Sequence, residues 1–242
     1  MLNRLIYVLG LHLLLVGAAQ ASVAPLSLEA YRQQSRNALS ELLIVGVAGE
    51  VPRDQRGRAI LAVVQAPNNG VDEQVIESLT AYREQHPDDL YAKLYEGYGW
   101  LFTAGEYLKQ QNYFRAAELA KRGFFLMDEA VDQAPENWRL RFLRARLDLY
   151  VPAEFGRHVV ALKDLRYLEE HPEQLPAAMS ELVDFLKIRA LTAAGQKADA
   201  EQLRDQLTRS PLWAELLQEQ GRLFLTAEEI QYVLAPIVRG EP

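Results

Sequence analysis

Apolar residues recur at helical spacing along nearly the whole chain from Leu26 onward. No stretch of six or more residues alternates apolar and polar positions in the manner of a half-buried strand. Residues 72–85 show the helical pattern clearly, because Ile76, Leu79 and Tyr82 lie at i, i+3 and i+6 and therefore share one helix face. The pattern predicts an all-α protein.

The residues before this segment contain the signals of two further helices. Ser27 is suited to cap a helix that runs through Leu39, and a short helix is expected over residues 58–65. The sequence APNNG that follows predicts a turn, because Asn and Gly tolerate left-handed backbone angles. Residues 42–48 are small or branched and fit either a helix or a short strand. Residues 42–66 are therefore the least defined part of the predicted fold.

A phrase that begins with a proline boundary recurs three times farther along the chain. In each copy a Pro ends one helix, and acidic residues after it favour the positive end of the next helix. Ten residues after the first two prolines lie Gly97 and Ala145, small residues that allow close approach of a neighbouring helix. The three copies are HPDDLYAKLYEGYGWL from His86, APENWRLRFLRARLDL from Ala134 and HPEQLPAAMSELVDFL from His171.

This arrangement is typical of tetratricopeptide repeats, which have a nominal length of about 34 residues. The prolines are spaced more widely than that, so the repeats are expected to be degenerate. A further helical hairpin is predicted around the turn AAGQK, which contains Gly195. Near the C-terminus, Thr226 and Glu229 have the spacing of a capping box.

The predicted fold is a right-handed, tetratricopeptide-like α-solenoid of roughly eight to ten helices packed as antiparallel pairs. The apolar tail that contains Trp213 and Phe224 is expected to form a C-terminal capping helix pair that closes the end of the stack. We expect one globular domain over residues 22–242. It comprises an N-terminal helical segment, 22–86, and the repeat region with its cap, 87–242.

The stretch from Leu90 to Leu168 also resembles a group of bacterial tetratricopeptide-like proteins of uncharacterised function. The resemblance covers about a third of the chain and implies a helical repeat fold without implying an activity. The chain departs from the group's pattern by inserting Gly156. The matching residues are Gly123, Met127, Asp128, Ala130, Val131, Ala134, Pro135, Asn137, Arg141, Arg144, Pro152, Phe155, Arg157, Ala161 and Asp164.

The first 21 residues have the composition of a signal peptide. Arg4 precedes a short apolar core, and Ala19 and Ala21 are placed like a cleavage site. The apolar core is shorter than the roughly 20 residues that span a bilayer, so we expect cleavage and no membrane attachment of the mature chain. The predicted location is exported, and within that the periplasm.

Composition excludes several classes of partner and chemistry. The chain has no cysteine, which excludes disulfides and thiolate sites, and its net charge of −7 gives it no long-range attraction to nucleic acid. The histidines show no spacing for a metal site, and no motif for a nucleophile or a cofactor is present. We therefore predict no catalytic residue, no metal and no cofactor. The sequence makes no prediction of the oligomeric state.

Arginines gathered around residue 141 are the strongest candidate site. Arg141 and Arg144 share a helix face, and carboxylates at Asp128, Asp132 and Asp164 are available nearby. The favoured interpretation is that the arginines set the register of adjacent helices through ion pairs. The alternative is that Arg141, Arg144 and Arg157 together clamp a carboxylate, a phosphate or an acidic peptide.

Tyr91, Tyr95 and Tyr98 form an aromatic stripe at i, i+4 and i+7. Such a stripe is most often part of the core, but rigid aromatic side chains also suit a peptide-docking groove. We predict a non-catalytic module that binds a protein or peptide partner of unspecified identity by its concave face. The alternative functions are a periplasmic binder of a small anionic ligand, accessory to solute uptake, and, as a third class, an enzyme.

Overall fold

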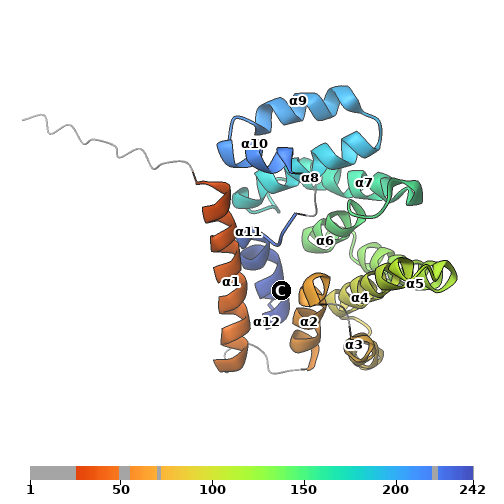
Figure 1. Ribbon diagram of the computed structural model, residues 1–242. Coiled ribbons are helices and arrows are strands. Elements are labelled where there is room, and N and C mark those ends of the chain that lie inside the picture. The colour runs from red at the N-terminus through yellow and green to blue at the C-terminus, as the bar shows by residue number, and fades with distance from the viewer. Residues whose placement is uncertain (1–25, 49–54, 70–71, 220–222, 242) are drawn as a thin grey trace, which may run out of the picture.

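The computed structural model describes residues 26–48, 55–69, 72–219 and 223–241, and within these ranges it is all-helical without a strand (Figure 1). The all-α prediction is thus confirmed. The predicted signal peptide, residues 1–21, lies outside the described residues. The main helices are α1 (Leu28–Ala48), α2 (Gln55–Asn69), α3 (Glu73–Gln85), α4 (Leu90–Lys109), α5 (Tyr113–Gln133), α6 (Trp138–Asp148), α7 (Arg157–Glu170), α8 (Ser180–Ala193), α9 (Lys197–Leu207), α10 (Pro211–Gln218), α11 (Ala227–Glu229) and α12 (Ala235–Arg239). Short 3₁₀ turns, η1 (Ala153–Phe155) and η2 (Ala177–Met179), precede α7 and α8, and a π-turn, η3 (Ile230–Leu234), joins α11 to α12.

Helix boundaries follow the local signals of the sequence in most places. The carboxylate of Asp89 accepts a hydrogen bond from the Ala92 amide at 2.9 Å at the start of α4, and the Asn137 side chain caps α6 in the same way. Helices α3, α5 and α7 each end two residues before one of the recurrent prolines. These prolines therefore mark the ends of helices, as predicted.

Two boundaries in the N-terminal part differ from the predicted ones. Helix α1 continues through residues 42–48, whose sequence fits either a helix or a strand, and ends at Ala48. Helix α2 does not end at Gln65 but extends to Asn69, so the predicted APNNG turn is wrong in position. Pro67 lies in the last turn of α2, and the helix ends two residues after it.

Successive helices from α2 to α9 pack against one another along the chain. The closest approach is between α4 and α5: a Cβ at Gly97 would lie 2.7 Å from the carbonyl oxygen of Gly123, and a Cβ at Gly123 would lie 2.7 Å from that of Gly97. These two glycines let the helix backbones touch. Alternate helices are also neighbours, since α4 contacts both α2 and α6. The inner sides of α2, α4 and α6 therefore line a common face.

The C-terminal segment folds back instead of closing the end of the array. Helix α10 packs on α8, but the chain then returns so that α11 and η3 contact α1 while α12 contacts α2 (Figure 1). The predicted capping box is present, with Glu229 accepting from the Thr226 amide at 2.8 Å. The expected end cap is thus replaced by a segment that lies between α1 and the inner face of the array.

Buried polar contacts hold this returning segment in place. Arg146 of α6 donates to Glu229 at 2.6 Å, and Arg56 of α2 donates to the Ile237 carbonyl at 2.6 Å. From the other side, the Tyr31 hydroxyl of α1 donates to Glu228 at 2.7 Å. The segment therefore connects α1 to the rest of the molecule, and one core cluster runs from Leu28 to Val238.

Candidate functional site

Arg141 and Arg144, the two arginines that share a face of α6, both point at Asp164 of α7. Arg144 binds the carboxylate in bidentate fashion, with Nε and Nη2 each 2.8 Å from an oxygen, and Arg141 Nη1 adds a third contact at 2.8 Å. The side chain of Asp164 has no exposed surface, and that of Arg144 is only 6% exposed. Asp164 therefore depends on these two guanidinium groups for its charge compensation.

Arg157 makes a second set of ion pairs beside the first. Its Nη atoms donate to both oxygens of Asp128 at 2.8 Å, and its Nε and Nη2 donate to Asp148 at 2.9 and 2.8 Å. Gly156, with φ +71°, ends the preceding turn and sets the direction in which α7 starts. The inserted glycine thus permits an Arg157 that faces α5 and α6. Arg144 also reaches Asp128 at 3.2 Å, so the two sets form one network.

Electrostatics in this network are dominated by burial. Burial raises the pKa of the Asp148 carboxyl to about 7, although hydrogen bonds from Arg157 oppose the shift. Three arginines face three acidic side chains, so the formal charges balance when Asp148 is ionised. The contacts of Arg141 and Arg144 with Asp164, and of Arg144 with Asp128, are those of the register-setting interpretation, whereas Asp148, which that interpretation did not include, pairs with Arg157. No contact within the described residues supports the anion-clamp alternative, because these guanidinium groups already bind carboxylates.

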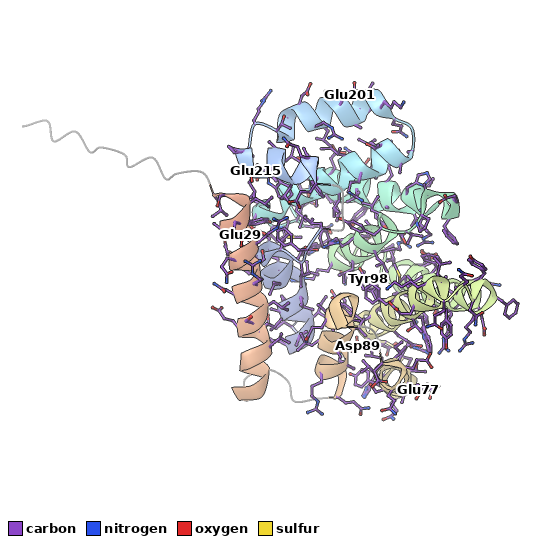
Figure 2. All side chains as sticks on the ribbon, in the orientation of Figure 1. Glu29, Glu77, Asp89, Tyr98, Glu201 and Glu215 are labelled. Atoms are coloured by element: carbon purple, nitrogen blue, oxygen red, sulfur yellow. The ribbon has the colours of Figure 1, made fainter. Side chains whose placement is uncertain are left out.

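The predicted tyrosine stripe lies where α4 meets α6. The Tyr91 hydroxyl accepts a hydrogen bond from Asn137 Nδ2 at 3.0 Å, Tyr95 is buried, and the Tyr98 hydroxyl donates to the Leu143 carbonyl. Figure 2 shows Tyr98 near the middle of the molecule. The three rings therefore serve the core in large part. The edges of Tyr95 and Tyr98 nevertheless reach a cleft.

This cleft, which we call the central cleft, has a volume of about 620 Å³ and lies between α1, the inner face of α2, α4 and α6, and the start of the returning segment. Its lining is mostly apolar, with cations at Arg32 and Arg36 of α1 and Arg146 of α6, and one anion at Glu229. Arg146 is fully engaged with Glu229 and two carbonyls, whereas Arg32 and Arg36 make ion pairs that are open to solvent. The apolar lining is formed by Leu39, Val64, Tyr95, Tyr98, Phe102, Leu143, Leu147, Leu223, Phe224 and Leu225.

Sequence reasoning located two of these residues, Tyr95 and Tyr98, and missed the rest. The contributions of α1 and of residues 223–225 depend on the fold-back of the C-terminal segment, for which the sequence carries no local signal. The exposed guanidinium of Arg36 had a detectable signal, since it lies one turn from Arg32 on a predicted helix.

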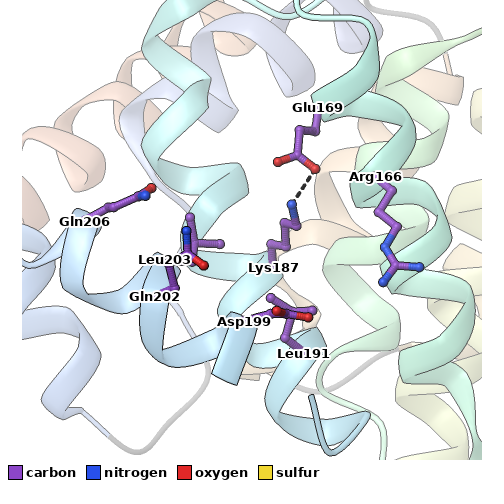
Figure 3. A pocket seen from close by; sticks show the side chains of 8 residues that line it. All are labelled: Arg166, Glu169, Lys187, Leu191, Asp199, Gln202, Leu203 and Gln206. Carbon is purple, nitrogen blue, oxygen red and sulfur yellow. Dashed lines mark hydrogen bonds and ion pairs between the residues drawn. The ribbon is translucent and has the colours of Figure 1, made fainter. Parts of the chain in front are cut away.

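A second, smaller groove of about 300 Å³ lies between α7, α8 and α9 (Figure 3). Lys187 of α8 forms an ion pair with Glu169 of α7, and Asp199 and Arg166 stand on opposite sides. Cations and anions are equally represented along its walls, and several of its side chains are exposed. This groove shows no bias toward a ligand charge, so it is a weaker candidate than the central cleft.

Metal binding finds no support in the parts of the chain that the structure describes, where His, Asp and Glu side chains form no group suited to hold an ion. His86 and His171 instead stack on Tyr82 and Tyr167, one turn earlier, with ring centroids 4.4 and 4.1 Å apart. Each of these pairs lies just before a recurrent proline, so two of the three recurrent segments share this contact, and the one that begins at Ala134 lacks the histidine.

None of the described helices combines the length and hydrophobicity that crossing a membrane requires. Comparison with protein-family models, with curated proteins and with solved structures finds no match to this chain.

Proposed function

We propose that the chain is an exported interaction module with a tetratricopeptide-like solenoid fold, which binds a protein or peptide segment in the central cleft and performs no chemistry. The main support for this proposal is the central cleft, because it is the larger of the two concavities described above, its lining is mostly apolar, and the solvent-accessible side chains of Arg32 and Arg36 lie at its edge. The sequential packing of α2–α9 and the touching glycines of α4 and α5 support the solenoid. The export of the chain rests on residues 1–21 alone.

The charge of the rim indicates the chemistry of the partner. The side chains of Arg32 and Arg36 are 32% and 54% exposed, and their partners, Glu219 and Glu29, are exposed carboxylates held by surface ion pairs. Such pairs contribute under about 1 kcal/mol, so an incoming carboxylate can replace them at low cost. A segment with apolar side chains for the lining and an acidic residue for the rim fits the cleft best.

The alternative, a small anion held by Arg141, Arg144 and Arg157, is less well supported. An anion would have to displace buried carboxylates from these guanidinium groups, and that would leave Asp164 charged and uncompensated.

Selection of peptides from a random displayed library, followed by titration of the enriched sequences, tests the proposal. We expect enrichment of short sequences that combine large apolar residues with Asp or Glu, and about tenfold weaker binding to Arg36→Glu. Arg58→Glu is the matched control, because Arg58 is exposed on α2, lies outside the cleft and changes the net charge equally. Equal binding to both variants would place the site elsewhere. Export is tested separately: amino-terminal sequencing of the exported chain should give Ser22 as its first residue.

A further inference from the structure

The solvent face of α5 carries an unusual concentration of exposed apolar surface. Phe114 is 85% exposed and Phe125 is 64% exposed, and they are eleven residues apart on one helix. At 3.6 residues per turn, eleven residues return to nearly the same direction, about 16 Å farther along the axis. Both phenyl rings therefore project from the same side of α5, away from α4.

Two opposite charges lie between the rings on the same stripe. Glu118 and Lys121 are exposed, and their directions fall within about 60° of both phenylalanines when they are placed on an ideal helix. Along the helix the order is thus apolar, acidic, basic, apolar. Arg115 pairs with Glu118 at the edge of the stripe, while Lys121 forms no ion pair within the described part of the chain.

This order is complementary to itself when it is reversed. If a second α5 lies antiparallel across the first, with the twofold axis at the level of residues 119 and 120, Phe114 faces Phe125 of the second copy and Glu118 faces its Lys121. The twofold axis repeats both contacts, as an isologous interface requires. A parallel arrangement would instead place like charges together.

We propose that a second copy of this chain docks on the α5 stripe, defined as Phe114, Glu118, Lys121 and Phe125, to form an antiparallel homodimer. A second copy of the chain is the partner that fits, because the twofold axis places Glu118 of each copy opposite Lys121 of the other. The interface consists of one helix pair and is smaller than the standard interface between stable partners, so the dissociation constant is expected on the order of 10 µM. The dimer leaves the central cleft open, because none of the residues that line the cleft belongs to α5.

Charge reversal provides the test. Glu118→Lys alone places two lysines opposite each other at both contacts, and Lys121→Glu alone does the same with two glutamates. Each variant should therefore weaken the dimer at least tenfold. An equimolar mixture of the two variants restores both opposite-charge contacts in a heterodimer, so the mixture should associate although neither variant does so alone.

Sedimentation velocity from about 1 to about 200 µM covers the expected constant and reports each species. Phe114→Ser should also weaken the dimer, whereas Val159→Ser, at an exposed position on α7, is the matched control and should not. All these positions are exposed, so circular dichroism should show every variant folded. A parent protein that stays monomeric over the whole range overturns the proposal. A mixture that fails to associate, or a control that weakens the dimer as much as Phe114→Ser, does so too.

Discussion

Replacing Arg144 with Met should destabilise the fold by about 3 kcal/mol, which is the lower end of the range for breaking a buried ion pair. Of the three hydrogen bonds from arginines that Asp164 accepts, the two from Arg144 are lost and the one from Arg141 remains. Asp164 therefore stays buried with half of its former cationic neighbours. The loss of stability is limited because Arg141 still binds Asp164 and Arg157 still binds Asp128. Solvent does not screen the ion pair of Arg144 and Asp164 appreciably, because both side chains are nearly inaccessible, so the expected loss of stability is not reduced on that account.

For a chain of this length, about 3 kcal/mol corresponds to a fall in Tm of roughly 6–12 °C. Thermal melts followed by circular dichroism measure it, with urea unfolding as a second measure. Arg36→Met is the control, since Arg36 is more than half exposed and its pair with Glu29 should contribute less than about 1 kcal/mol. If Arg144→Met and Arg141→Met both melt at or above the parent temperature, the ion pairs do not set the helix register and the anion-binding alternative gains support.

Two further predictions concern packing and pH. Gly97→Ala should lower the free energy of unfolding, measured in urea, by about 1–3 kcal/mol, because its Cβ would lie 2.7 Å from a backbone carbonyl of α5. Gly105→Ala, on the same helix with open space around it, is the control and should be neutral or slightly stabilising. Equal effects of the two substitutions would contradict the close approach of α4 and α5. Asp148 has a folded-state pKa of about 7, raised above its ordinary value of 3.8, so its contribution to the free energy of unfolding is present at low pH and decreases as the pH rises from about 4 to about 7. Asp148→Asn cannot titrate, so the parent protein should lose stability relative to this variant across that interval, and a constant difference between the two would refute the assignment.

Local features of the fold were the ones that the sequence predicted well. Proline boundaries and the capping box of Thr226 and Glu229 act on neighbours a few residues away, so they can be read from short stretches. Helix α2 shows the limit of this reading, because Pro67 and the asparagines after it favour a turn and yet complete a helix.

Pairing across most of the length of the chain could not be predicted. Arg146 binds Glu229 across 83 residues of chain, but many other acidic residues have the same chemistry, so only the fold selects the partner. The central cleft depends on the pairing of Arg146 with Glu229, because the cleft forms only when the segment that includes Phe224 lies against α1. The α5 stripe could not be predicted for the same reason, because Phe114 and Phe125 have the spacing of core residues and only their exposure distinguishes them.

The returning C-terminal segment also has a consequence for the order of folding. Helix α1 binds its partners at sequence separations of 192 and 197 residues, through Ser35 with the Ala227 amide and Tyr31 with Glu228. During synthesis, the helical hairpins from α3 to α9 find their neighbours as soon as they are made, whereas the partners of Ser35 and Tyr31 are made 192 and 197 residues later. Closing so long a loop is slow compared with local pairing, so α1 should gain protection from hydrogen exchange after the array during refolding. Helix α1 is thus expected to be stabilised last among the described helices, when it meets residues 227–234.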